Sequence, residues 1–176
     1  MTEDPWYAER RGRWKPAHVQ LVIIAESAPD NGEDEANRRL FYDDDLSGRD
    51  GLFRQVVQML FDGSDIKSGR GAKRPWLEKL RDRGVYLIDL ASVPVNNHSR
   101  SDRAAALDQN ISATVTLASE LAPDGIVLIK KNVFELLSEP LRAAGLPVRH
   151  DEFIPFPASG QQTSFRERFA AAISSS

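Results

Sequence analysis

Four short apolar runs separated by helical patterns constrain the fold of this chain more than any other feature of its sequence. Each run is nearly continuous in apolar residues, which is typical of parallel strands that are buried on both faces. Segments with apolar residues at helical spacing lie between the runs. The expected strands are Val19–Ala25, Val85–Leu90, Gly125–Lys130 and a weaker one at Val148–Phe153, and the expected helices are Gly51–Phe61, Arg74–Arg83, Asp102–Leu121 and Val133–Ala144.

This order of strands and helices predicts an α/β fold. Right-handed crossovers place helices on both faces of one sheet, so we expect a three-layer α/β/α sandwich around a central, mostly parallel four-stranded sheet. The 176 residues, of which 41% are hydrophobic, suffice for one core of this kind. We expect one α/β domain over residues 19–173, preceded by a basic and aromatic N-terminal extension over residues 1–18.

The composition excludes several classes of site. Because the chain has no cysteine, it has no disulfides, cysteine nucleophiles, thiolate zinc sites or cysteine-held iron–sulfur clusters. Lys and Arg total 23 against 26 for Asp and Glu, a formal net charge of −3. This balance is not that of a dedicated electrostatic coat for nucleic acid, although it allows a local basic face.

The lengths of the apolar runs and the character of the N-terminal segment bear on the location and partners of the chain. No run approaches the ~20 residues that cross a bilayer, and the N-terminal segment lacks the apolar centre of a secretory signal. We therefore expect no membrane partner and a cytoplasmic location. The amphipathic helices are compatible with a monomer, which is the expected state, and they leave a dimer open.

Acidic side chains follow two expected strands, at the sheet edge where open α/β folds bind ligands. Glu26 follows the first strand, and a buried carboxylate there could act as a general base with a raised pKa. It could equally cap the next segment or pair with a basic residue. Asp89 ends the second strand inside an apolar run, so it needs hydrogen-bond donors. It is either an acceptor for loop amides or a residue that contacts a ligand.

The loop after the first strand holds both aromatic and acidic residues. Phe41 could stack on a planar base or fold back onto the core. The acidic run 43–45 lacks the spacing and glycine of a calcium loop, so we expect a solvated turn and no metal. Further along, the stretch 67–83 is basic and suits either phosphate contact or a solvated helix face.

Together these segments resemble the uracil-DNA glycosylase superfamily over about residues 19–169. The stretch Ala25-Glu26-Ser27-Ala28-Pro29 is similar to the Gly-Glu-Ala-Pro-Gly or Gly-Gln-Asp-Pro-Tyr-His motif that follows the first strand of that family. Phe41 matches its base-stacking aromatic, and Asp89 matches the asparagine that reads the uracil edge. Phe156-Pro157-Ala158-Ser159-Gly160 looks like its final His-Pro-Ser-Pro motif.

The resemblance implies a nucleobase-binding cleft at the strand ends and excision of a damaged base from DNA, without a metal or another cofactor. Glu26 and Ser27 would orient or activate water. Phe41, Asp89 and Phe156 would contact the base. Extrusion of a base requires contacts to the nucleic acid, which the resemblance and the basic residues assign to Lys73, Arg74, Arg100, Ser159 and Gly160.

Two departures from the family pattern bear on activity. Phe156 replaces a histidine and cannot donate a hydrogen bond to the departing base. Asp89 replaces the asparagine and, when ionised, accepts but does not donate. The alternative is a non-catalytic or repurposed member of the fold that binds a nucleic acid, a small ligand or a protein partner. A third alternative is a hydrolase of a small nucleotide that uses Glu26 and Asp89 as paired carboxylates.

Overall fold

Three parallel strands form the centre of the molecule. The structure is a computed structural model that describes residues 5–30, 39–62 and 66–174. Strands β1 (Leu21–Ala25), β2 (Val85–Asp89) and β3 (Gly125–Leu128) lie in the order β2-β1-β3. Because the central strand β1 has a neighbour on each side, Ile23 faces Leu87 on one strand and Val127 on the other.

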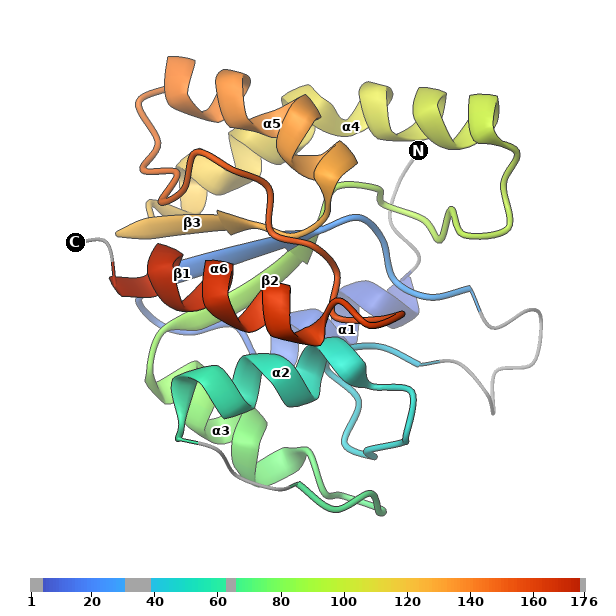
Figure 1. Ribbon diagram of the computed structural model, residues 1–176, viewed down its shortest axis with the longest axis vertical. Helices are drawn as coiled ribbons and strands as arrows, with labels where there is room; N and C mark the ends of the chain where they lie inside the picture. Colours follow the sequence, from blue (N-terminus) through green and yellow to red (C-terminus); the bar gives the residue numbers. More distant parts are fainter. Residues whose placement is uncertain (1–4, 31–38, 63–65, 175–176) are drawn as a thin grey trace.

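Helices cover both faces of this sheet (Figure 1). Helices α4 and α5 lie on one face, and α2, α3 and α6 lie on the other. None of the helices in the described ranges combines the length and apolarity that a bilayer crossing requires. The helices are α1 (Pro5–Arg13), α2 (Gly51–Leu60), α3 (Arg74–Asp82), α4 (Arg100–Leu121), α5 (Lys131–Ala143) and α6 (Gln162–Ser174).

The α/β class and the parallel sheet are confirmed, but the sheet has three strands where we predicted four. In place of the predicted strand Val148–Phe153, only two isolated parallel bridges occur beside β3, Ile126 to Val148 and Ile129 to Ile154. Between these bridges the imidazole of His150, and not a backbone carbonyl, is the hydrogen-bond acceptor for β3. Its Nε2 accepts a hydrogen bond from the Leu128 N–H (2.9 Å), and its Nδ1 lies 2.8 Å from the Glu152 carbonyl.

The N-terminal helix is packed onto the rest of the domain. Tyr7 and the following Trp14 are each only 5% exposed and belong to the same core cluster as the sheet. Arg11 forms an ion pair of 3.1 Å with Asp89 at the end of β2. The described part of the segment that we predicted as an extension, residues 5–18, therefore packs on the domain and reaches the edge of the sheet where β2 ends.

The outer edge of β2 is occupied by a side chain. The buried Tyr42 hydroxyl donates to the Leu87 carbonyl (2.9 Å) and accepts from the Leu87 N–H (2.6 Å). Burial raises the pKa of Tyr42 well above 10.0, so the hydroxyl stays neutral. This tyrosine satisfies both backbone groups of an edge residue and ties the loop that carries Phe41 to the sheet.

We predict that His150→Phe makes stability less dependent on pH. Burial lowers the pKa of His150 below 6.5, so the unfolded state binds the proton more readily than the native state. The wild-type imidazole therefore contributes stability above the unfolded pKa, and this contribution falls as pH decreases. Phenylalanine keeps the ring contact to Phe134 but removes the acceptor for Leu128, at a cost of about 1–2 kcal/mol.

Urea unfolding followed by tryptophan fluorescence measures this effect. The free energy of unfolding of the variant should be lower than that of the wild type at about pH 8, and the difference should shrink towards about pH 5. A difference that stays constant or grows on acidification would contradict the assigned hydrogen bond.

Candidate functional site

A cavity of about 310 Å³ opens at the carboxyl ends of β1 and β2. Every residue that the sequence assigned to catalysis or to base contact lines it, namely Glu26, Ser27, Phe41, Asp89 and Phe156. These residues come from the ends of two strands and from two distant loops. The sequence placed them at one sheet edge, and the structure brings them to one cavity.

Glu26 is surrounded by hydrogen-bond donors. The residue is 8% exposed, and its carboxylate accepts from Arg103 of α4 (Nε to Oε1, 2.8 Å), from Lys130 after β3 and from Asn132 of α5. Burial by itself would raise the pKa of Glu26, but the hydrogen bonds from Arg103, Lys130 and Asn132 outweigh it and lower the pKa below 4.5. Glu26 is therefore an ionised carboxylate at neutral pH, and it is a weak base.

The backbone of Lys130 is strained where it enters this cluster. Lys130 has φ 90° and ψ 144°, a region that only glycine adopts freely. Its N–H donates to the Ile154 carbonyl (2.7 Å), and its ammonium group pairs with Glu26. A conformation of this kind costs about 1–3 kcal/mol and is concentrated at functional sites. It turns the lysine from the end of β3 into the cavity wall.

Two aromatic side chains line the cavity. Phe41 packs edge-on against Phe53 of α2, with ring centroids 5.1 Å apart, and this contact holds the Phe41 ring in place. Phe156 is 40% exposed, and among the described residues only Leu117 is another large apolar side chain with comparable exposure. A half-exposed phenylalanine at the rim of a mostly apolar cavity is suited to contact a planar ligand.

The polar groups of the cavity include both acceptors and donors. Asp89 presents a carboxylate whose side chain is 4% exposed and paired with Arg11. Asn96, from the loop after β2, accepts from the Asp30 N–H through Oδ1 (2.7 Å). Within the described residues the Asn96 amide nitrogen makes no hydrogen bond, which leaves a donor at the cavity. Ser27 accepts weakly from the Val95 N–H (3.4 Å).

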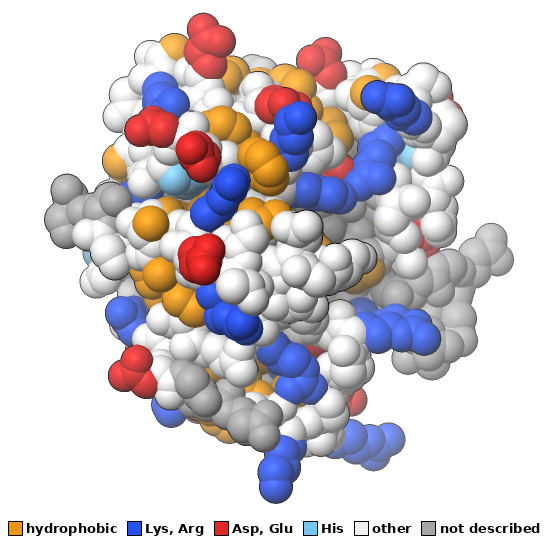
Figure 2. Space-filling model, in the orientation of Figure 1, with side chains coloured by type: hydrophobic (Ala, Val, Ile, Leu, Met, Phe, Trp, Pro, Cys, Tyr) orange, Lys and Arg blue, Asp and Glu red, His pale blue; other side chains and the backbone are white. Residues whose placement is uncertain are grey.

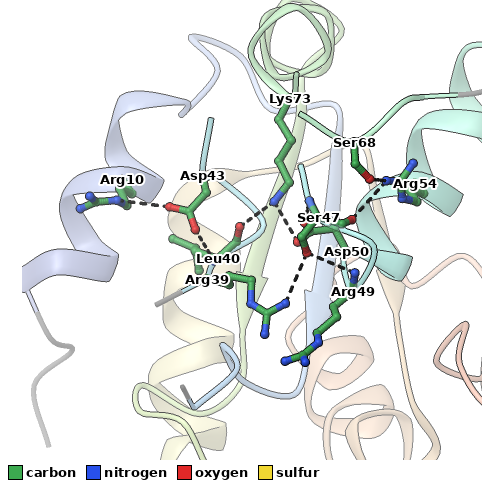
Figure 3. A network of polar contacts seen from close by, with 10 residues as sticks. All are labelled: Arg10, Arg39, Leu40, Asp43, Ser47, Arg49, Asp50, Arg54, Ser68 and Lys73. Carbon is green, nitrogen blue, oxygen red and sulfur yellow. Dashed lines mark hydrogen bonds and ion pairs between the residues drawn. The ribbon is translucent and has the colours of Figure 1, made fainter. Parts of the chain in front are cut away.

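A buried lysine holds the loop that carries Phe41 (Figure 3). Lys73 is 0% exposed, and its Nζ donates to the Leu40 carbonyl and to Asp50 Oδ1, both at 3.0 Å. Burial lowers the pKa of Lys73, and Asp50 partly opposes this shift. Asp50 also accepts from the Ser47 N–H (2.6 Å). One cation thus fixes both ends of the segment 40–50.

The nucleic-acid contacts predicted from the sequence lie outside the cavity. The predicted contact of Lys73 does not fit the structure, because a fully buried ammonium group cannot reach a phosphate. Arg74, Arg100, Ser159 and Gly160 are exposed, and basic side chains outnumber acidic ones over the lower half of the face in Figure 2. Ser159 and Gly160 form a turn with φ of 51° and 81°.

Sequence reasoning missed several residues of the cavity: Arg49, Asn96, Arg103 and Lys130. Lys130 carried a usable signal, since it directly follows an apolar strand. Arg103 carried none, because an arginine in the first turns of a long helix is ordinarily a surface residue. Within the described ranges no three side chains of His, Asp or Glu gather as a metal site.

We predict that Lys73→Met destabilises the protein by about 3 kcal/mol, because Asp50, whose side chain is only 11% exposed, is left without its cation. Urea unfolding measures the change. The matched variant Lys73→Met/Asp50→Asn, which removes both charges, should regain part of the loss. If Lys73→Met were as stable as the wild type, Lys73 would not hold the loop.

The site as a whole is an apolar cavity lined by aromatic side chains. The ionised Glu26 carboxylate and its donors lie in its wall, and Asp89 and Asn96 add a second carboxylate and an amide for hydrogen bonding. Such a site can bind a planar, polar-edged molecule. No protein-family model matches the chain, and no curated protein matches it.

Proposed function

We propose that this protein is a uracil-DNA glycosylase-like domain that binds a nucleobase in its strand-end cavity and acts on damaged bases in DNA. The observation that carries the proposal is that Phe41, Asp89 and Phe156 line one cavity, although the three residues lie far apart in the sequence. Two rings and an edge-reading carboxylate are the groups that a planar base with polar edges requires.

Asp89 and Asn96 can divide the reading of the base edge between them. Uracil offers an imide N–H donor and carbonyl acceptors. The Asp89 carboxylate can accept from the imide, whereas the Asn96 amide nitrogen can donate to a carbonyl. Asn96 thus supports the proposal by supplying the donor that an aspartate in the asparagine position lacks.

The charge state of Glu26 favours one of its two predicted roles. A carboxylate with a lowered pKa abstracts protons poorly but stays anionic. In base excision Glu26 would orient a water and would stabilise positive charge that develops on the sugar, instead of acting as the base.

A second candidate is a base-binding domain without catalysis. Two cations, from Arg103 and Lys130, already form ion pairs with the Glu26 carboxylate. Phe156 offers no hydrogen bond to a departing base. These two observations favour binding over excision, and the same cavity would serve either function.

We predict that Phe156→Ala weakens binding of 2′-deoxyuridine, measured by isothermal titration calorimetry, by about tenfold, the loss expected for one base-stacking contact. Leu117→Ala is the matched control, because it removes a similarly exposed apolar side chain from α4. Equal affinities in wild type, Phe156→Ala and Leu117→Ala would overturn the cavity as a base site. Absence of binding to the wild type would do the same.

We predict that Glu26→Gln abolishes base release from oligonucleotides that carry uracil, hypoxanthine or a mismatch. Release is followed on single- and double-stranded substrates by strand cleavage at the abasic product, resolved on gels. Glu135→Gln, at an exposed position of α5, should leave release unchanged. Nucleoside binding without release by the wild type on every substrate would establish the second candidate and overturn the first.

A further inference from the structure

A second hollow, of about 820 Å³, adjoins the cavity. Arg49 lines both spaces, so the two are neighbours that share this residue. The second hollow lies between α1, the segment 39–49 and the segment 69–70. We call it the arginine groove after the five arginines that line it: Arg10, Arg13, Arg39, Arg49 and Arg70.

The carboxylates of the groove are engaged by the protein itself. Asp43 accepts from the Leu40 N–H (2.8 Å) and lies 3.4 Å from Arg10. Asp45 accepts from the Gly71 N–H (2.8 Å). Asp44 lies 3.9 Å from Arg74, which is not part of the groove. The acidic run therefore stabilises its own loop and leaves most of the arginines without an acidic partner.

Three arginines of the groove, Arg39, Arg49 and Arg70, form no ion pair within the described part of the chain. The Arg39 guanidinium only donates to Ser47 Oγ (3.3 Å). In Figure 3 the guanidinium groups of Arg39 and Arg49 extend towards the same space. Two like charges directed at one space, neither paired with a carboxylate of the described residues, are suited to bind an anion. Guanidinium groups bind phosphate through two parallel hydrogen bonds.

We propose that the arginine groove binds the phosphodiester backbone of a single nucleic-acid strand whose base occupies the cavity. This inference rests on the proposed function of the cavity. A free base would use the cavity alone, and a mononucleotide would need only Arg39 and Arg49. The groove is larger than the cavity and continues to Arg70 and Arg13, so it has room and charge for the phosphates that flank the bound nucleotide.

The test compares two probes on the same variants. The first is a fluorescein-labelled oligothymidylate of about 12 nucleotides with one central deoxyuridine, measured by anisotropy at several salt concentrations. The second is 2′-deoxyuridine, which carries no phosphate. In Arg39→Ala/Arg70→Ala, whose two side chains line the groove and not the cavity, oligonucleotide affinity should fall at least about tenfold, and the slope of log affinity against log salt should decrease by about two. Affinity for deoxyuridine should not change.

The control Lys79→Ala/Arg166→Ala removes the same charge from exposed positions of α3 and α6 that line neither space. It should bind the oligonucleotide like the wild type. Wild-type oligonucleotide affinity in Arg39→Ala/Arg70→Ala would overturn the groove while leaving the cavity intact. Oligonucleotide binding that needs these arginines, in a wild type that does not bind deoxyuridine, would overturn the proposal that one strand occupies both spaces, since the groove would then act without the cavity.

Discussion

The carboxylate of Glu26 needs donors because the central strand delivers it to a buried position, where an unpaired charge would cost several kcal/mol. The donors come from α4, from the end of β3 and from α5. The ionised Glu26 carboxylate therefore links four elements, β1, β3, α4 and α5, at the carboxyl ends of the strands. The strained backbone of Lys130 fits this arrangement, since an unstrained residue there would direct its ammonium group elsewhere. The shape of the cavity depends on this cluster.

The three strands and the helices α2 to α5 could be predicted because their buried residues recur at the spacing of a strand or a helix. Val85–Asp89 and the other two strands are short apolar runs, and α2 places Phe53, Val57 and Leu60 on one face. The apolar run Val148–Phe153 was wrongly predicted as a strand, because the side chain of His150, and not a strand backbone, accepts the hydrogen bond of the Leu128 N–H there. An imidazole can satisfy a strand N–H as well as a carbonyl can, and no pattern of hydrophobicity reveals it. The N-terminal helix was missed because its contacts to the core depend on Tyr7 and Arg11, not on a repeated apolar face.

Those residues of the candidate site that directly follow a strand could be predicted from the sequence. Glu26 and Asp89 follow strands, and parallel topology alone brings such residues to one edge. What sequence could not supply was the protonation state of Glu26, because it depends on Arg103 and Asn132, which are more than 70 positions away in the chain. Nor could composition separate Lys73, which is fully buried, from the exposed basic residues beside it. Burial of a lysine requires a partner in space, and Asp50 lies 23 positions earlier.

The hydroxyl of Tyr42 has a consequence beyond the loop that it holds. A sheet of three strands has two open edges, and an exposed strand edge can pair with a strand of another molecule and so begin aggregation. Tyr42 occupies the amide and carbonyl of Leu87 on one edge, and His150 occupies the amide of Leu128 on the other. Side chains thus occupy part of each edge, beside the isolated backbone bridges to Val148 and Ile154 on the β3 side. Because an imidazole loses its acceptor on protonation and a neutral phenol does not, the two edges differ in acid: protonation of His150 removes the partner of the Leu128 amide, whereas Tyr42 keeps both of its hydrogen bonds to Leu87.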